Sequence, residues 1–255
     1  MGSGKKNFQC TLYGLTILLA ILIIWEWGGR AGAVSSLVLP LPSHILIEGA
    51  HQLVSSEFLT NWYRTLVVWM VSLGFGLAIG LLLGFASGAS KGVALTLFPL
   101  FSYFRSIPPI ALFPIALIAI GPGNLSIGVV ATFGAALYVF PGTAAAARET
   151  ADRFSHLAKI LGSSRAQFLR LFVAPGAAVH ALASSRIAAT YSFAVCVAGE
   201  MIIGGRFGVG AAILDLSERY RIEQAYSYIL CTGIVGLIID TLFAQISRLR
   251  VLGNK

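Results

Sequence analysis

The chain has 255 residues, of which 57% are hydrophobic and only 11% are charged. A soluble domain carries about 25% charged residues, so this composition excludes a water-soluble globular protein. The same hydrophobicity excludes intrinsic disorder. A net charge of +8 would suggest nucleic-acid binding in a soluble protein. Here the basic residues lie between apolar runs, which is typical of membrane topology signals, and we expect no nucleic-acid partner.

Six apolar runs predict membrane-spanning helices, because one bilayer crossing needs about 20 apolar residues. In chain order they cover residues 11–27, 66–85, 93–120, 125–139, 176–203 and 226–246. A cleaved signal peptide is the alternative explanation of the first run, since Ala31-Gly32-Ala33 is similar to a cleavage site. The five further runs favour an uncleaved helix. The sequence therefore predicts an all-α, polytopic membrane protein with about six transmembrane helices.

Prolines and glycines subdivide these runs. The third run is interrupted by Pro108, Pro109 and Pro114, and the fourth is expected to end at Pro141-Gly142. Glycines at positions 76, 80 and 84 form a ridge of small residues against which another helix can pack closely. In the long segment after the first run, we expect a partial helix over residues 43–55.

The basic residues predict the orientation. With the N-terminus inside, eleven basic residues fall on the inner side and five on the outer side. The inner set is Lys5, Lys6, Lys91, Arg148, Arg153, Lys159, Arg165, Arg170, Arg248, Arg250 and Lys255, and the outer set is Arg30, Arg64, Arg206, Arg219 and Arg221. By the positive-inside rule, this bias predicts that both termini are cytoplasmic.

The inner loop at residues 148–175 is too polar to span a membrane, but its apolar residues recur at helical spacing. Gly162 is expected to break a first helix. Ser164 followed by Gln167 matches a capping box that begins a second, and Pro175-Gly176 is expected to end it. The loop is predicted to be a two-helix element that either lies on the inner membrane face or docks a partner.

Ionisable residues within apolar runs are candidate functional groups, because charges at that depth are costly. Arg105 is expected near mid-membrane, as an anion contact on a substrate path or as an ion-pair partner of Glu200 or Asp240. Pro108 and Pro109 would free backbone carbonyls towards a cavity or merely kink the helix. Glu200 would gate substrate entry or cap the loop at Gly204-Gly205, and Arg186 is expected to pair with Asp240. The sequence predicts no catalytic site and no metal site.

The stretch from His156 to Pro175 resembles the EAA loop of permease subunits of bacterial ABC importers. That loop runs E-A-A, three residues, G, and then about a dozen residues to L-P; Gly162, Pro175 and Ala158 match it, whereas His156 stands in place of the glutamate. The resemblance implies that the loop couples to an ATPase. The coupling residues are then His156, Leu157, Ala158, Lys159, Leu161, Gly162, Ser163, Ser164, Phe168, Phe172 and Pro175. We expect the apolar ones to dominate docking, with Lys159 and Arg165 at the rim.

Other segments resemble the sulfonate, taurine and nitrate branch of that family. They are Leu41-Pro42-Ser43, Arg105-Ser-Ile-Pro-Pro109, Ala198-Gly-Glu-Met201 and Gly208-Val-Gly210. The resemblance implies a type I importer permease fold, with residues 1–62 as first helix and outer segment, 63–250 as permease core and 251–255 as cytoplasmic tail. It implies a small anion such as sulfonate, taurine, nitrate or bicarbonate as the substrate, and our hypothesis from the residues themselves puts Arg105, Pro108, Pro109 and Glu200 on the substrate path.

The resemblance also implies the partners. Two cytoplasmic ATPase subunits would bind ATP and Mg, and this chain would hold no cofactor, since it has no G-x-x-x-x-G-K-[ST] phosphate loop. A second permease copy, membrane lipid and a periplasmic or extracellular binding protein complete the set, in the bacterial cytoplasmic (inner) membrane. The alternative function is a self-sufficient carrier or channel for a small anion, in which Arg105 would be a selectivity charge.

Overall fold

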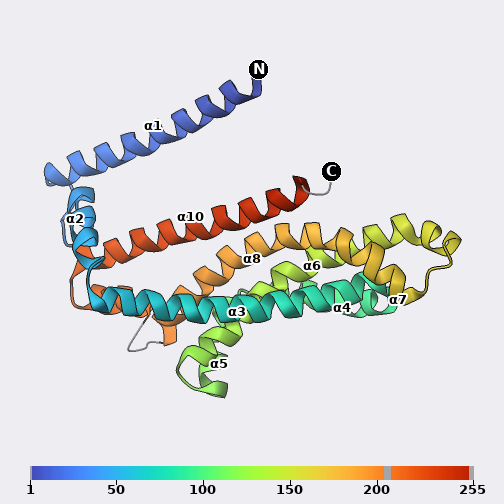
Figure 1. Cartoon of the computed structure of the whole chain (residues 1–255). Helices are drawn as coiled ribbons and strands as arrows, with labels where there is room; N and C mark the ends of the chain where they lie inside the picture. Colours follow the sequence, from blue (N-terminus) through green and yellow to red (C-terminus); the bar gives the residue numbers. More distant parts are fainter. Residues whose placement is uncertain (1, 204–207, 253–255) are drawn as a thin grey trace. The chain divides into compact units, whose positions relative to one another are not determined.

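The computed structural model describes residues 2–203 and 208–252, and these residues form helices joined by short turns (Figure 1). The helices are α1 (Gly2–Arg30), α2 (Pro42–Gln52), α3 (Ser56–Ala89), α4 (Lys91–Arg105), η1 (Pro109–Leu112), α5 (Phe113–Ile120), α6 (Asn124–Ile160), α7 (Arg165–Phe168), η2 (Leu169–Val173), α8 (Ala174–Ile203), α9 (Val209–Glu218) and α10 (Ile222–Leu252). The predicted all-α fold is confirmed, and α2 corresponds to the partial helix expected after the first run.

Among the residues that the structure describes, five helices are long and apolar enough to cross a membrane: Leu12–Arg30, Ser56–Ala89, Asn124–Ile160, Ala181–Ile203 and Ile222–Ser247. A sixth candidate is broken, because α4 and the Pro109–Ile120 segment pass the same test together but bend by 87°. The bend falls at Pro108-Pro109, where proline removes a backbone donor and clashes with the preceding turn. The prediction of about six spans, one of them broken by proline, is confirmed.

The chain forms two compact units. Unit 1 comprises Met1–Leu59 and Ala212–Cys231, and unit 2 comprises Thr60–Ala211 and Thr232–Lys255. In unit 1, one polar face of α2 is bonded to the start of α10. His44 Nδ1 lies 2.9 Å from a Glu223 carboxylate oxygen, Gln224 Nε2 donates to Glu48 at 2.6 Å, and Ser227 donates to Gln52 at 2.9 Å. The spacing of four residues along α2 puts these three side chains on one helix face.

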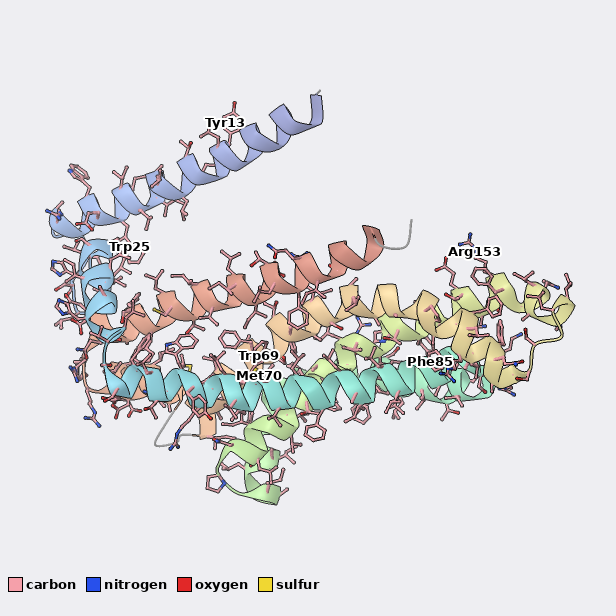
Figure 2. All side chains as sticks on the ribbon, viewed as in Figure 1. Tyr13, Trp25, Trp69, Met70, Phe85 and Arg153 are labelled. Atoms are coloured by element: carbon pink, nitrogen blue, oxygen red, sulfur yellow. The ribbon has the colours of Figure 1, made fainter. Side chains whose placement is uncertain are left out.

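Unit 2 is built on the pairing of α6 with α8, which run side by side in Figure 1. Small residues let the two helices pack closely: a Cβ at Gly142 of α6 would clash with the Ser184 side chain of α8, and a Cβ at Gly176 of α8 would lie 2.6 Å from the Thr150 side chain of α6. A third helix, α3, contributes Trp69, which donates from Nε1 to the Ala189 carbonyl at 3.0 Å. Trp69 and Phe85 are labelled along α3 in Figure 2.

The predicted glycine ridge of α3 packs against α6 within the same chain. A Cβ atom at Gly76, Gly80 or Gly84 would lie 2.5 to 2.8 Å from the nearest α6 atom, and one at Gly88 would lie 2.3 Å from Ala147. These distances are shorter than real Cβ contacts, so the absence of a side chain is what permits the helices to touch. The prediction of close helix packing is confirmed.

Two predicted helix ends are wrong. α6 is 37 residues long and continues through Pro141 to Ile160, because packing on both sides of the proline outweighs its missing hydrogen bond; Phe140 before it and Ala144 after it are fully buried. Pro175 does not end a helix either. The wide π-helical turn η2 precedes it, in which the Ala174 N–H bonds to the Leu169 carbonyl five residues back. The wider turn accommodates Pro175, and the chain continues as α8.

Candidate functional site

The inner loop forms a helical hairpin, here called the coupling hairpin, made of the last turns of α6, α7, η2 and the first turn of α8. Its turn closes with two backbone bonds, Gly162 N–H to Lys159 at 3.1 Å and Ser163 N–H to Ala158 at 3.0 Å. This is a Schellman pattern, in which the residue after the cap takes a left-handed conformation. Gly162 has φ +63°, so glycine is the residue that fits without strain.

The second helix of the hairpin begins as predicted. The Gln167 N–H donates to Ser164 Oγ at 3.3 Å, and the Ser164 N–H donates to the Gln167 side chain at 2.9 Å. This reciprocal capping box satisfies donors that the helix start leaves free. It fixes where the chain turns back after Gly162.

The aromatic residues of the hairpin face inwards. The Phe172 ring lies 5.8 Å from the Phe154 ring of α6 and 6.1 Å from the Phe168 ring. Phe168 also packs against a buried cluster that contains Ala147 and Val173. Phe168 and Phe172 therefore join the two arms of the hairpin, and both are only partly exposed.

A different set of apolar side chains is presented outwards at the hairpin tip. Leu157 is 44% exposed, Leu161 is 61% exposed and Ile160 is 82% exposed. Sequence reasoning missed Ile160, although its spacing of three from Leu157 would have placed it on the same helix face. Another exposed residue, Leu171 (64%), was also missed.

Charged and small residues surround these tip residues. His156, Lys159, Arg165 and Arg170 are exposed, Ser163 and Ser164 lie in the turn, Ala158 is buried and Pro175 is exposed. Arg153 projects from the last turns of α6 (Figure 2), and its guanidinium lies 5.6 Å from the centre of the Phe154 ring. The hairpin tip is thus apolar and is surrounded by basic side chains.

The break between α4 and η1 holds the other predicted residues. Arg105 is the last residue of α4, is exposed, and forms no ion pair within residues 2–203 and 208–252. Pro108 is exposed and Pro109 is buried. The helix after the break is anchored by Phe113, which is fully buried and against which a Cβ at Gly199 would lie 2.4 Å away. The 87° bend is therefore held by packing.

Glu200 lies in a buried network, here called the Glu200 lock, and is 5% exposed. Thr65 Oγ of α3 lies 2.7 and 2.9 Å from its two carboxylate oxygens, and the Gly210 N–H donates to it at 2.9 Å. Thr65 in turn accepts from the Val209 N–H at 2.9 Å. Glu200 and Thr65 thus together accept from the first two free donors of α9, as an N-cap does. The loop at Gly204-Gly205, which Glu200 was expected to cap, lies outside the described residues.

The Arg186–Asp240 pair expected from the sequence is confirmed. Arg186 Nε and Nη2 donate to the two oxygens of Asp240 at 2.6 and 2.5 Å. Such a bidentate pair is specific in geometry, and it ties α8 to α10 within unit 2. In the part of the chain that the structure describes, no group of three or more His, Cys, Asp or Glu residues could hold a metal ion.

Comparison with known proteins finds a family match and relatives that are transport permeases. Residues 76–250 match the model of a family described as "binding-protein-dependent transport system inner membrane component". The bicarbonate transport system permease protein CmpB of Synechococcus elongatus is 27% identical over 96% of this chain and 93% of its own length. The nitrate import permease protein NrtB of Synechocystis is 31% identical over 97% and 94%.

Among solved structures, the chain is similar to one of the inward-facing conformations of the MetNI methionine ABC transporter. The TM-score is 0.66 with 21% sequence identity, and the alignment covers 75% of this chain and 95% of that chain. At this level of identity the likeness shows the fold alone.

Proposed function

The chain belongs to the family of binding-protein-dependent transport system inner membrane components, and from this membership we propose how its parts divide the work of an ATP-driven importer. The chain is a transmembrane permease subunit, and ATP hydrolysis is done by partner ATPase subunits. The observation that carries the proposal is the family match over residues 76–250, which includes the broken span, the coupling hairpin and Glu200.

The coupling hairpin is the proposed contact with the cytoplasmic ATPases. Burial of a Leu or Ile side chain contributes about 1.5–3 kcal/mol, whereas an exposed ion pair contributes about 0–1 kcal/mol. We therefore assign most of the docking energy to Leu157, Ile160 and Leu161, with Lys159 and Arg165 at the rim. Phe168 and Phe172 support the tip from behind, since they pack on α6.

Hydrogen bonds within unit 1 support six crossings. Residues 44–52 follow the first span and residues 223–227 begin the last one, yet the two segments are bonded to each other. They must then lie on the same side of the membrane, which requires an even number of crossings between them. Counting the bent pair as one crossing gives four, and the basic-residue bias favours cytoplasmic termini in a bacterial inner membrane.

The substrate path is proposed to run along the break after α4. The guanidinium of Arg105 is exposed and has no ion-pair partner among the described residues, so it can contact an anion. Pro108 and Pro109 interrupt the helix beside it. Two copies of the chain would line the path as a homodimer. Glu200 is better explained as a support of this region, because its oxygens already bind Thr65 and Gly210.

We propose that the substrate is a small oxyanion, since the relatives include permeases for bicarbonate and nitrate. The test is uptake of labelled nitrate, bicarbonate, sulfonate and taurine into liposomes that contain this chain, its ATPase and its binding protein. We expect uptake of one of these anions that depends on ATP. A control with a hydrolysis-deficient ATPase should abolish it. Uptake by this chain alone at the full rate would instead show a self-sufficient carrier.

A further inference from the structure

A strained turn in unit 1 presents an exposed aromatic side chain. α9 ends in a Schellman pattern, with the Arg221 N–H bonded to Leu216 at 2.9 Å and the Tyr220 N–H bonded to Ser217 at 3.1 Å. The left-handed position of that pattern is occupied by Tyr220, at φ +57°, where glycine is preferred. A tyrosine in this conformation is costly to the fold, so an external role of its side chain is indicated. The side chain is 77% exposed.

Two cavities flank this turn within unit 1. One, of about 360 Å³, is lined by Glu48, Glu57, Asp215, Arg219, Arg221 and Gln224 among others. The second, of about 280 Å³, is lined by Leu37, Glu48, Tyr220, Arg221 and Gln224 among others. The Glu48–Gln224 hydrogen bond of 2.6 Å belongs to both linings. An exposed tyrosine and an arginine beside preformed cavities resemble the residues that dominate protein interfaces.

The charges of the larger cavity indicate what it accepts. Asp215 is paired with Arg219 at 2.8 Å, so these two charges compensate each other. Glu48 accepts from an uncharged amide, which leaves Glu48 and Glu57 against the single guanidinium of Arg221. One negative charge is in excess among these residues, and this favours a cationic side chain over an anion.

Span counting puts this turn on the side of the membrane opposite the coupling hairpin, because an odd number of crossings separates them. The proposed function requires a soluble binding protein on that side, since the family is binding-protein-dependent. We propose that the Tyr220–Arg221 turn and its two cavities are the docking surface of the substrate-binding protein, and that a Lys or Arg of that protein enters the larger cavity to meet Glu48 and Glu57. This inference rests on the proposed function.

The experiment measures the affinity of the complex, reconstituted in nanodiscs, for the binding protein that stimulates its ATPase activity. Tyr220→Gly removes the ring and suits the left-handed turn, so folding is retained. Its Kd should rise at least tenfold, and Glu48→Gln/Glu57→Gln should raise it by a similar factor. The matched control is Tyr63→Ala, which removes another exposed tyrosine (70%) and should leave the Kd unchanged. Basal ATP hydrolysis without binding protein should be that of wild type in every variant.

A photo-crosslinking residue at position 220 identifies what covers the turn. We expect an adduct with the purified binding protein that is lost when the binding protein is omitted. An adduct with lipid alone, together with a wild-type Kd in Tyr220→Gly, would overturn the proposal and make Tyr220 an anchor at the membrane interface. If the wild-type complex shows no stimulation by any binding protein, the proposed function itself fails, which is a separate result.

Discussion

The coupling hairpin and the Glu200 lock lie at the two ends of α8 and differ in what they expose to their surroundings. The hairpin leaves Ile160 82% exposed and holds its turn with backbone bonds and a capping box. The lock buries a carboxylate to 5% exposure and surrounds it with donors from α3 and α9. Exposed apolar side chains stabilise nothing within the chain, whereas every contact of the lock does. Substitutions in the lock should therefore affect the fold, and substitutions at the tip should affect only assembly.

The largest expected effect is at Gly210. A Cβ there would lie 2.0 Å from the Val197 carbonyl oxygen and 2.9 Å from Glu200 Cβ. Because the nearest atom belongs to the backbone of α8, Gly210→Ala should destabilise the protein by about 3 kcal/mol or more. Thermal unfolding in detergent measures this. The control is Gly74→Ala, whose Cβ meets nothing within 4 Å; equal melting temperatures for the two variants would contradict the geometry of the lock.

The second largest effect is expected from loss of the Glu200 carboxylate. Glu200→Ala leaves the Gly210 N–H and the Thr65 hydroxyl without their acceptor, which should cost roughly 2–3 kcal/mol. Glu200→Gln keeps one acceptor oxygen and should lose less. Melting temperature and uptake per folded molecule are measured together. If both variants are as stable as wild type but do not transport, Glu200 is a substrate or gating residue and the lock is a secondary feature.

A smaller effect is expected inside the hairpin. Phe168 is half-buried against Phe172 and the cluster around Val173, so Phe168→Ala should cost roughly 1–2 kcal/mol by loss of apolar contact. The loss should appear as faster hydrogen exchange over residues 154–173. ATPase binding should weaken only to the extent that the hairpin frays. Strong loss of ATPase binding with unchanged exchange would mean that Phe168 contacts the ATPase directly.

Two substitutions at Gly162, in the turn of the coupling hairpin, distinguish the effect of backbone strain from the effect of side-chain size. Gly162→Ala and Gly162→Trp both force a left-handed residue at a cost of about 1–2 kcal/mol, and space is open around the glycine, since a Cβ would meet nothing within 4 Å. Both should fold, but only the tryptophan adds a ring at the docking face. We expect substrate-stimulated ATP hydrolysis to persist in the alanine variant and to be lost in the tryptophan variant. Full stimulation of the tryptophan variant would exclude the turn from the interface.

Much of this arrangement follows from local sequence patterns. The glycine ridge, the capping box at Ser164 and the broken third span were predicted because each rests on residues a few positions apart. The continuation of the helices through Pro141 and Pro175 was not predicted. It depends on packing from α3 at Pro141 and on the π-helical turn η2 at Pro175. The partner of Glu200 was not predicted either, because Thr65 is 135 residues away. The exposure of Ile160 and the inward direction of Phe168 could not be predicted from the sequence, because apolar spacing does not show which residues face the second arm of the folded hairpin.

The most direct test of the account is ATPase retention by the Ile160→Asp variant compared with the wild type. The aspartate places a charge on an 82% exposed apolar side chain, so the permease should keep its wild-type melting temperature. Purified complexes are titrated with salt, and the ATPase that remains bound is quantified. The account predicts a wild-type complex that resists salt, because apolar contacts are not screened, and loss of most of the ATPase from Ile160→Asp at every salt concentration. Retention of the ATPase by Ile160→Asp, together with dissociation of the wild type by moderate salt, would contradict it.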